Sequence, residues 1–131
     1  DRGGCCEGVL YRLPDNDHHD QLRRLVRREA GYREDVAATR WINVRTDSGA
    51  VRALVFYAGP AGRDYTGKKS PEAVAHILAC AAGHMGSCAM YLYQTVTKLE
   101  EHGINDRHLW HLQELVAAQI EKITRSGTAD T

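Results

Sequence analysis

Apolar residues recur with helical spacing in the stretch QLRRLVRREAGYRED, which begins at residue 21. Leu22, Leu25 and Val26 fall on one face of the helix that this spacing predicts. At about 100° per residue, Glu29 lies between Leu25 and Val26 in angle and in line with Leu22. The pattern therefore places a carboxylate on the face of the helix that should contact the core.

Two explanations fit a carboxylate at that position. The side chain of Glu29 can turn outward and pair with one of the neighbouring arginines, which are Arg23, Arg24, Arg27, Arg28 and Arg33. Alternatively, its apolar neighbours destabilise the charged form of the carboxylate and suit it to general acid–base catalysis. The spacing of the residues does not separate these two explanations.

The rest of the pattern predicts strands and three further helices around clear turn and cap residues. Strands are expected at 7–13 and in a hairpin of 36–46 and 50–58, and helices at 18–30, 71–83, 88–102 and from 107 onward. Ser70 and Asp106 are the expected N-caps, and Gly103 ends one helix. This layout predicts a single α+β domain over residues 1–124, followed by a flexible tail at 125–131.

The composition of the chain excludes some classes of function but does not identify one. The chain has 131 residues, and its 17 basic and 17 acidic residues cancel, so no net charge draws it to nucleic acid or to a membrane. Four cysteines form no disulfide-scaffold pattern, which favours reduced thiols in the cytoplasm. The chain begins without Met and almost at once with a predicted strand, so we expect a fragment of a longer protein.

Histidine and cysteine offer competing sites. His76 and Cys80 lie four residues apart on one predicted helix, and His84 and Cys88 have the same spacing across a loop. Four such ligands suit tetrahedral zinc, although a thiol among apolar neighbours, as at Cys80, is usually core packing. Cys88 near His84 could also act as a nucleophile, and GHMGS before a helix could hold an anion. The aromatic side chains Tyr57, Tyr91, Tyr93 and Trp110 are expected in the core more than in a site.

Several stretches, beginning with GGCCEGVLYRLP and LRRLVRREAGY, resemble the glutathione-specific branch of the ChaC-like γ-glutamylcyclotransferases. GGCCEGVLYRLP is similar to a family strand that ends in Arg-Leu-Pro, and LRRLVRREAGY to a helix that ends in Arg-Glu before glycine and tyrosine. VRALVFYA, DYTG, SPEAVAHILACAAGHMGSCAMYL and LEEHGINDRHLWHLQELV follow in the family's order and rough spacing. The resemblance covers nearly all of residues 3–123.

This resemblance implies a fold, a reaction and a site. The fold would be a small mixed β-sheet or barrel with packed helices, and Glu29 would be the catalytic acid/base. Tyr32 and Tyr91 would contact the substrate. The reaction would convert glutathione, a small-molecule substrate, into 5-oxoproline and cysteinylglycine in the cytoplasm, without a metal or a cofactor.

The sequence also departs from the family. Only Ala30 and Gly31 separate Glu29 from the tyrosine, Met90 replaces a glutamate, and Cys88 stands where asparagine is common. The N-terminal strand is missing, together with its Tyr-Gly-Ser loop, which in the family holds the γ-glutamyl group. We therefore expect impaired activity of the chain taken alone. A non-catalytic ligand-binding or interaction domain, and a cyclotransferase for other γ-glutamyl amines, both remain open alternatives.

Overall fold

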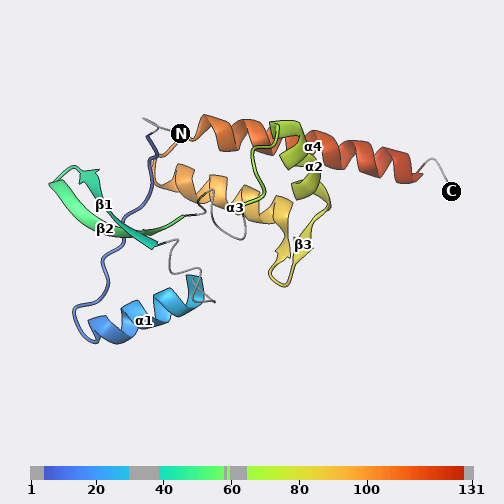
Figure 1. Ribbon diagram of the computed structural model, residues 1–131. Helices are drawn as coiled ribbons and strands as arrows, with labels where there is room; N and C mark the ends of the chain where they lie inside the picture. The colour runs from blue at the N-terminus through green and yellow to red at the C-terminus, as the bar shows by residue number, and fades with distance from the viewer. Residues whose placement is uncertain (1–4, 30–38, 58, 60–64, 129–131) are drawn as a thin grey trace. The chain divides into compact units, whose positions relative to one another are not determined.

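Helices and short antiparallel strands make up the chain, which confirms the α+β class (Figure 1). The structure is a computed structural model, and it describes residues 5–29, 39–57, 59 and 65–128. It divides into two units, one formed by Leu10–Gly67 and the other by Asp1–Val9 with Lys68–Thr131. That residues 1–124 act as one domain stays a prediction.

The unit Leu10–Gly67 holds one helix and one β-hairpin. Helix α1 spans His18–Glu29, and strands β1 (Thr39–Thr46) and β2 (Gly49–Phe56) pair antiparallel. Thr46 lies opposite Gly49, so the hairpin turns through two residues, and the Thr46 hydroxyl donates to the Gly49 carbonyl at 2.8 Å. Gly49 has a φ of +121°, which L side chains rarely adopt, and this explains the glycine at the turn. The predicted helix and hairpin are both confirmed for the residues that the structure describes, while residues 30, 36–38 and 58 of these predictions lie outside them.

The other unit is mainly helical. It contains α2 (Pro71–Cys80), β3 (Ala82–Gly83), β4 (Gly86–Ser87), α3 (Cys88–Glu101) and α4 (Arg107–Thr128). Helix α4 packs against α2 and α3. Figure 1 shows α2 in yellow-green, α3 in light orange and α4 in orange to red. The buried core joins these three helices through Ala75, Leu92, Val96 and Val116. Among the residues described, no helix is both long and apolar enough to pass through a lipid bilayer.

Polar caps start the helices of this unit. The Ser70 hydroxyl accepts the backbone N–H of Ala73 at 3.2 Å, and Pro71 occupies the first helical position, where a backbone N–H would have no partner within the helix. The Asp106 carboxylate accepts the N–H groups of His108 and Leu109 at 2.9 and 3.1 Å. Both predicted caps are confirmed.

Two local predictions differ from the structure, and a third is not decided by it. Residues 7–13 form no strand, because no other described strand lies beside them to complete a hydrogen-bonded ladder. Helix α2 ends at Cys80 rather than at 83, since Ala82 and Gly83 pair with Ser87 and Gly86 in a short hairpin. Helix α4 continues to Thr128; residues 129–131 lie outside the described part of the chain, and the flexible tail at 125–131 stays a prediction.

Candidate active site

Helix α1 carries the candidate catalytic carboxylate at its last residue. The apolar positions of this helix, Leu22, Leu25 and Val26, are each partly buried, as the helical spacing predicted. The arginines of the helix lie on its other side and are exposed. Glu29 follows the apolar stripe at the point where α1 ends.

The carboxylate of Glu29 is held by its neighbour in sequence. The Nε of Arg28 donates to Oε1 of Glu29 at 2.7 Å, and Nη2 of the same guanidinium lies 2.7 Å from the same oxygen. The side chain of Glu29 is 37% exposed, whereas that of Arg28 is 74% exposed. The structure therefore meets the first of the two explanations drawn from the sequence: the side chain of Glu29 is among the exposed residues of the helix, and its carboxylate pairs with an arginine.

Only one of the two carboxylate oxygens takes part in this pairing. Within the described ranges, Oε2 of Glu29 makes no hydrogen bond and no ion pair. An ionised carboxylate has acceptor sites on both oxygens, so Oε2 can take a proton from a bound molecule and return it. The geometry of Glu29 thus suits general acid–base chemistry.

The two tyrosines proposed as substrate contacts differ in what the structure says of them. Tyr32 lies outside the described residues. Tyr91 lies in the first turns of α3 and is 73% exposed. Its position is set by Ser87, whose hydroxyl caps α3 by accepting the N–H of Met90 at 3.1 Å. Glu29 belongs to the unit Leu10–Gly67 and Tyr91 to the other unit.

Three of the four aromatic residues expected in the core are on the surface instead, while Tyr57 is partly buried. Tyr91, Tyr93 and Trp110 all rank among the exposed large hydrophobic residues. The core of the helical unit is built from smaller aliphatic side chains, which fit between closely packed helices. An exposed tyrosine keeps its hydroxyl free to contact a ligand, so the surface position of Tyr91 agrees with its proposed role.

The competing histidine and cysteine sites gain no support. In the part of the chain that the structure describes, no group of three or more His, Cys, Asp or Glu side chains could hold a metal ion. Cys80 is exposed at the end of α2, so its interpretation as core packing is wrong. The segment GHMGS forms a tight hairpin, in which Gly83 pairs with Gly86. The backbone of Gly86 has a φ of +113°.

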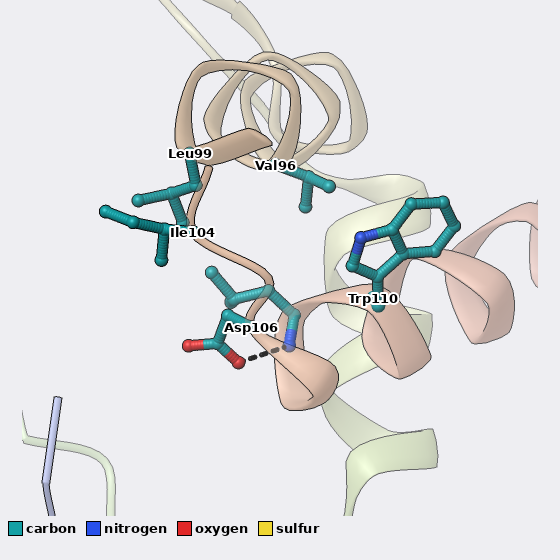
Figure 2. A pocket seen from close by; sticks show the side chains of 6 residues that line it. Val96, Leu99, Ile104, Asp106 and Trp110 are labelled. Atoms are coloured by element: carbon teal, nitrogen blue, oxygen red, sulfur yellow. Dashed lines mark hydrogen bonds between the residues drawn. The ribbon is translucent and has the colours of Figure 1, made fainter. Parts of the chain in front are cut away.

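One small hollow lies where α3 turns into α4, and the sequence reasoning did not find it (Figure 2). It is too shallow to enclose a water molecule, and it is lined by Val96, Leu99, Ile104, Asp106, Leu109 and Trp110. Its one ionisable side chain, Asp106, is bonded to backbone N–H groups of α4. The signal in the sequence was the Gly103 to Asp106 turn between two apolar helices. A mainly apolar lining with one capping carboxylate is typical of a corner between two packed helices and not of a catalytic site.

Comparison with known proteins gives two findings. The model of the ChaC-like protein family matches residues 1–119. A glutathione-specific γ-glutamylcyclotransferase of Escherichia coli (strain K12) is 31% identical over 134 residues, an alignment that covers 97% of this chain and 57% of that enzyme. The chain thus spans a little over half the length of the curated relative that it matches.

Proposed function

Since the chain belongs to the ChaC-like protein family, we propose that it acts as a glutathione-specific γ-glutamylcyclotransferase. The observation that carries this proposal is the family match across residues 1–119. The similarity to the E. coli enzyme of that name supports it over 97% of this chain. Glutathione is then the small-molecule substrate, and the proposed location is the cytoplasm.

The proposed reaction is an intramolecular acyl transfer. The α-amine of the γ-glutamyl group attacks its own γ-carbonyl carbon, and a five-membered lactam ring closes. The C–N bond to the cysteinyl residue then breaks, which releases 5-oxoproline and cysteinylglycine. At neutral pH the α-amine is mainly an ammonium group, so it must lose a proton before it can attack.

We assign both proton transfers to Glu29. Its carboxylate first takes the proton from the α-amine and then gives one to the leaving cysteinyl nitrogen, so one side chain serves as base and as acid. The support for this role is the resemblance of LVRREAGY to the family motif, together with the Oε2 oxygen, which accepts no hydrogen bond from any residue that the structure describes. Neither step calls for a metal or a cofactor.

The rest of the rate enhancement would come from positioning. The attacking amine and the carbonyl belong to one molecule, so a site that holds the γ-glutamyl chain curled removes much of the remaining entropic barrier. Tyr32 and Tyr91 are proposed to contact the substrate in this conformation. The resemblance and the exposure of Tyr91 support that assignment.

The test compares the protein with its Glu29→Gln variant. Glutamine keeps the size of the side chain but cannot exchange a proton, so we expect kcat for 5-oxoproline formation to fall by about 10²- to 10⁴-fold. Mass spectrometry of 5-oxoproline and cysteinylglycine measures the turnover. Full activity in Glu29→Gln would remove Glu29 from the mechanism.

The same assay separates the alternatives. Product from other γ-glutamyl amines but not from glutathione would indicate a cyclotransferase of different specificity. Binding of glutathione without any product, measured by calorimetry, would indicate a non-catalytic binding domain and would contradict the proposed activity.

A further inference from the structure

The guanidinium of Arg28 contacts the proposed catalytic carboxylate in an unusual way. Its Nε and Nη2 both approach the same oxygen, Oε1 of Glu29, each at 2.7 Å. In the common fork arrangement the two nitrogens would take one carboxylate oxygen each. Here the acceptor capacity of Oε1 is used, and Oε2 has no partner among the described residues.

Helical spacing does not favour this contact. Side chains of adjacent helical residues point about 100° apart, whereas residues three or four apart face each other. Arg24 and Arg27 are exposed on the same helix and make no ion pair with any residue that the structure describes. The side chain of Arg28 nevertheless contacts Glu29, its neighbour in sequence, at the end of α1.

The position of Glu29 at a helix C-terminus explains why a cation is needed there. The C-terminal end of a helix carries partial negative charge, which disfavours a carboxylate at the last residue. Arg27 and Arg28 occupy the last turn of α1 and offset that charge. Of these two residues, Arg28 is the one whose contact with the carboxylate also fixes its orientation.

From this geometry we infer that Arg28 is a positioning residue, which holds Oε1 of Glu29 and leaves Oε2 as the oxygen that exchanges the proton. The inference rests on the proposed function and deepens it. Arg28 acts through Glu29 and does not contact the substrate. It fixes which lone pairs of the carboxylate face the α-amine and the leaving nitrogen.

Stability measurements alone would not reveal this role. Exposed ion pairs add little to the free energy of unfolding, and Arg28 is mostly exposed. We therefore expect Arg28→Ala to unfold at the same denaturant concentration as the unmodified protein. A loss of activity without a loss of stability is the signature of a positioning residue.

The kinetic test uses Arg28→Ala, Arg28→Lys and the matched control Arg24→Ala. We expect kcat of Arg28→Ala to fall by about tenfold to a hundredfold, because a misplaced carboxylate transfers protons poorly. KM should stay within about twofold, since no binding contact to the substrate is lost. Arg28→Lys should recover part of kcat, and guanidinium ion far below denaturing concentrations should rescue Arg28→Ala. Arg24→Ala should behave like the unmodified protein.

Other kinetic outcomes would overturn the inference. Unchanged kcat in Arg28→Ala would show that Glu29 needs no such support. A rise in KM at constant kcat would make Arg28 a substrate-binding residue instead. An equal loss in Arg24→Ala would point to the general charge of α1 rather than to the contact with Oε1.

A spectroscopic measurement tests the pairing of Arg28 with Glu29 independently of the proposed function. In ¹H–¹⁵N spectra, the Nε–H signal of Arg28 should be shifted by its hydrogen bond and should move to the position of free arginine in Glu29→Ala. No movement would overturn the pairing even if the protein is active. Because impaired activity is expected of this chain taken alone, the proposed function is overturned if a protein that also carries the N-terminal Tyr-Gly-Ser loop is inactive. The Nε–H signal decides the pairing in either case.

Discussion

Asp106 shows how much a single side chain determines at the residue scale. One of its carboxylate oxygens, Oδ1, accepts both the His108 and the Leu109 N–H groups, so it satisfies two of the unpaired donors at the start of α4. Figure 2 shows the bond to the N–H of α4 beside the apolar side chains of the helix corner. The same residue therefore starts the longest described helix and closes the turn that leads into it.

Replacing Asp106 with alanine should destabilise the protein. Loss of a capping side chain costs about 1 kcal/mol, within a range of about 0.5–2 kcal/mol. Chemical denaturation followed by circular dichroism measures the change in the free energy of unfolding. Asp106→Asn is the matched control, since its amide oxygen still caps the helix, and it should lose much less. Equal losses in the two variants would mean that the charge, not the cap, stabilises α4.

Residue patterns predicted caps well but did not predict which arginine meets Glu29. Caps follow from local rules, because a hydroxyl or a carboxylate bonds to N–H groups two or three residues later. The partner of Glu29 depends on side-chain conformation at the helix end, and helical spacing favours residues three or four apart. Five nearby arginines satisfied the charge requirement equally, and Arg33 lies outside the described residues; among the four arginines of α1, the contact of Arg28 with Glu29 required the structure.

At the scale of elements, α3 joins the hairpin β3–β4 to the core. Leu92 and Val96 lie four residues apart on its buried face and contact the core residues of α2 and α4. Tyr91 and Met90 lie on the exposed part of the same turn. Within a few residues, α3 thus carries side chains that pack in the core and side chains that face solvent.

Truncation of Leu92 should test that division. Leu92→Ala removes a buried side chain and leaves a cavity, so we expect a loss of about 2–5 kcal/mol in the free energy of unfolding. Met90→Ala on the same helix is the control: Met90 is 53% exposed, and its removal should change stability by less than about 0.5 kcal/mol. Urea denaturation of both variants provides the comparison. A small loss in Leu92→Ala would show that the core collapses around the gap.

Element ends were harder to predict than element types. The spacing of apolar residues identified α1, the hairpin β1–β2 and the three later helices, since these patterns repeat over several turns. The end of α2 depends instead on the pairing of Ala82 with Ser87, which no periodicity predicts. The expected strand at 7–13 failed for a related reason, because strand patterning says nothing about whether a partner strand is present.

At the scale of the whole molecule, helices distant in sequence are linked by charge as well as by packing. Glu72 lies in the first turn of α2, and His111 lies on α4, which packs against it. The pKa of Glu72 is lowered from its ordinary value of 4.5, chiefly by a hydrogen bond from its own backbone N–H and then by one from the Ser70 hydroxyl. Desolvation opposes these two effects, and the charge of His111 makes the smallest of the four contributions, which lowers the pKa of Glu72 further.

The lowered pKa of Glu72 fixes how its contribution to stability depends on pH. A carboxyl group whose pKa is lower in the folded state stabilises that state when ionised, so its contribution is complete above the ordinary value of 4.5 and is lost as the pH falls through the lowered pKa. Glu72→Gln should therefore be less stable than the unmodified protein at about pH 6, and the two should converge below the folded-state pKa. Urea midpoints measured from about pH 2.5 to about pH 7 test this directly.

A second substitution isolates the part of this effect that crosses between helices. In a His111→Ala background, the loss of stability caused by Glu72→Gln should shrink, because the interaction between α2 and α4 is already lost, but it should persist through the local hydrogen bonds at the start of α2. An unchanged loss would confine the role of Glu72 to its own helix end. A loss that stays constant down to about pH 2.5 would contradict the lowered pKa itself, since neutral glutamic acid and glutamine would then have to differ by the same amount as the carboxylate and glutamine do.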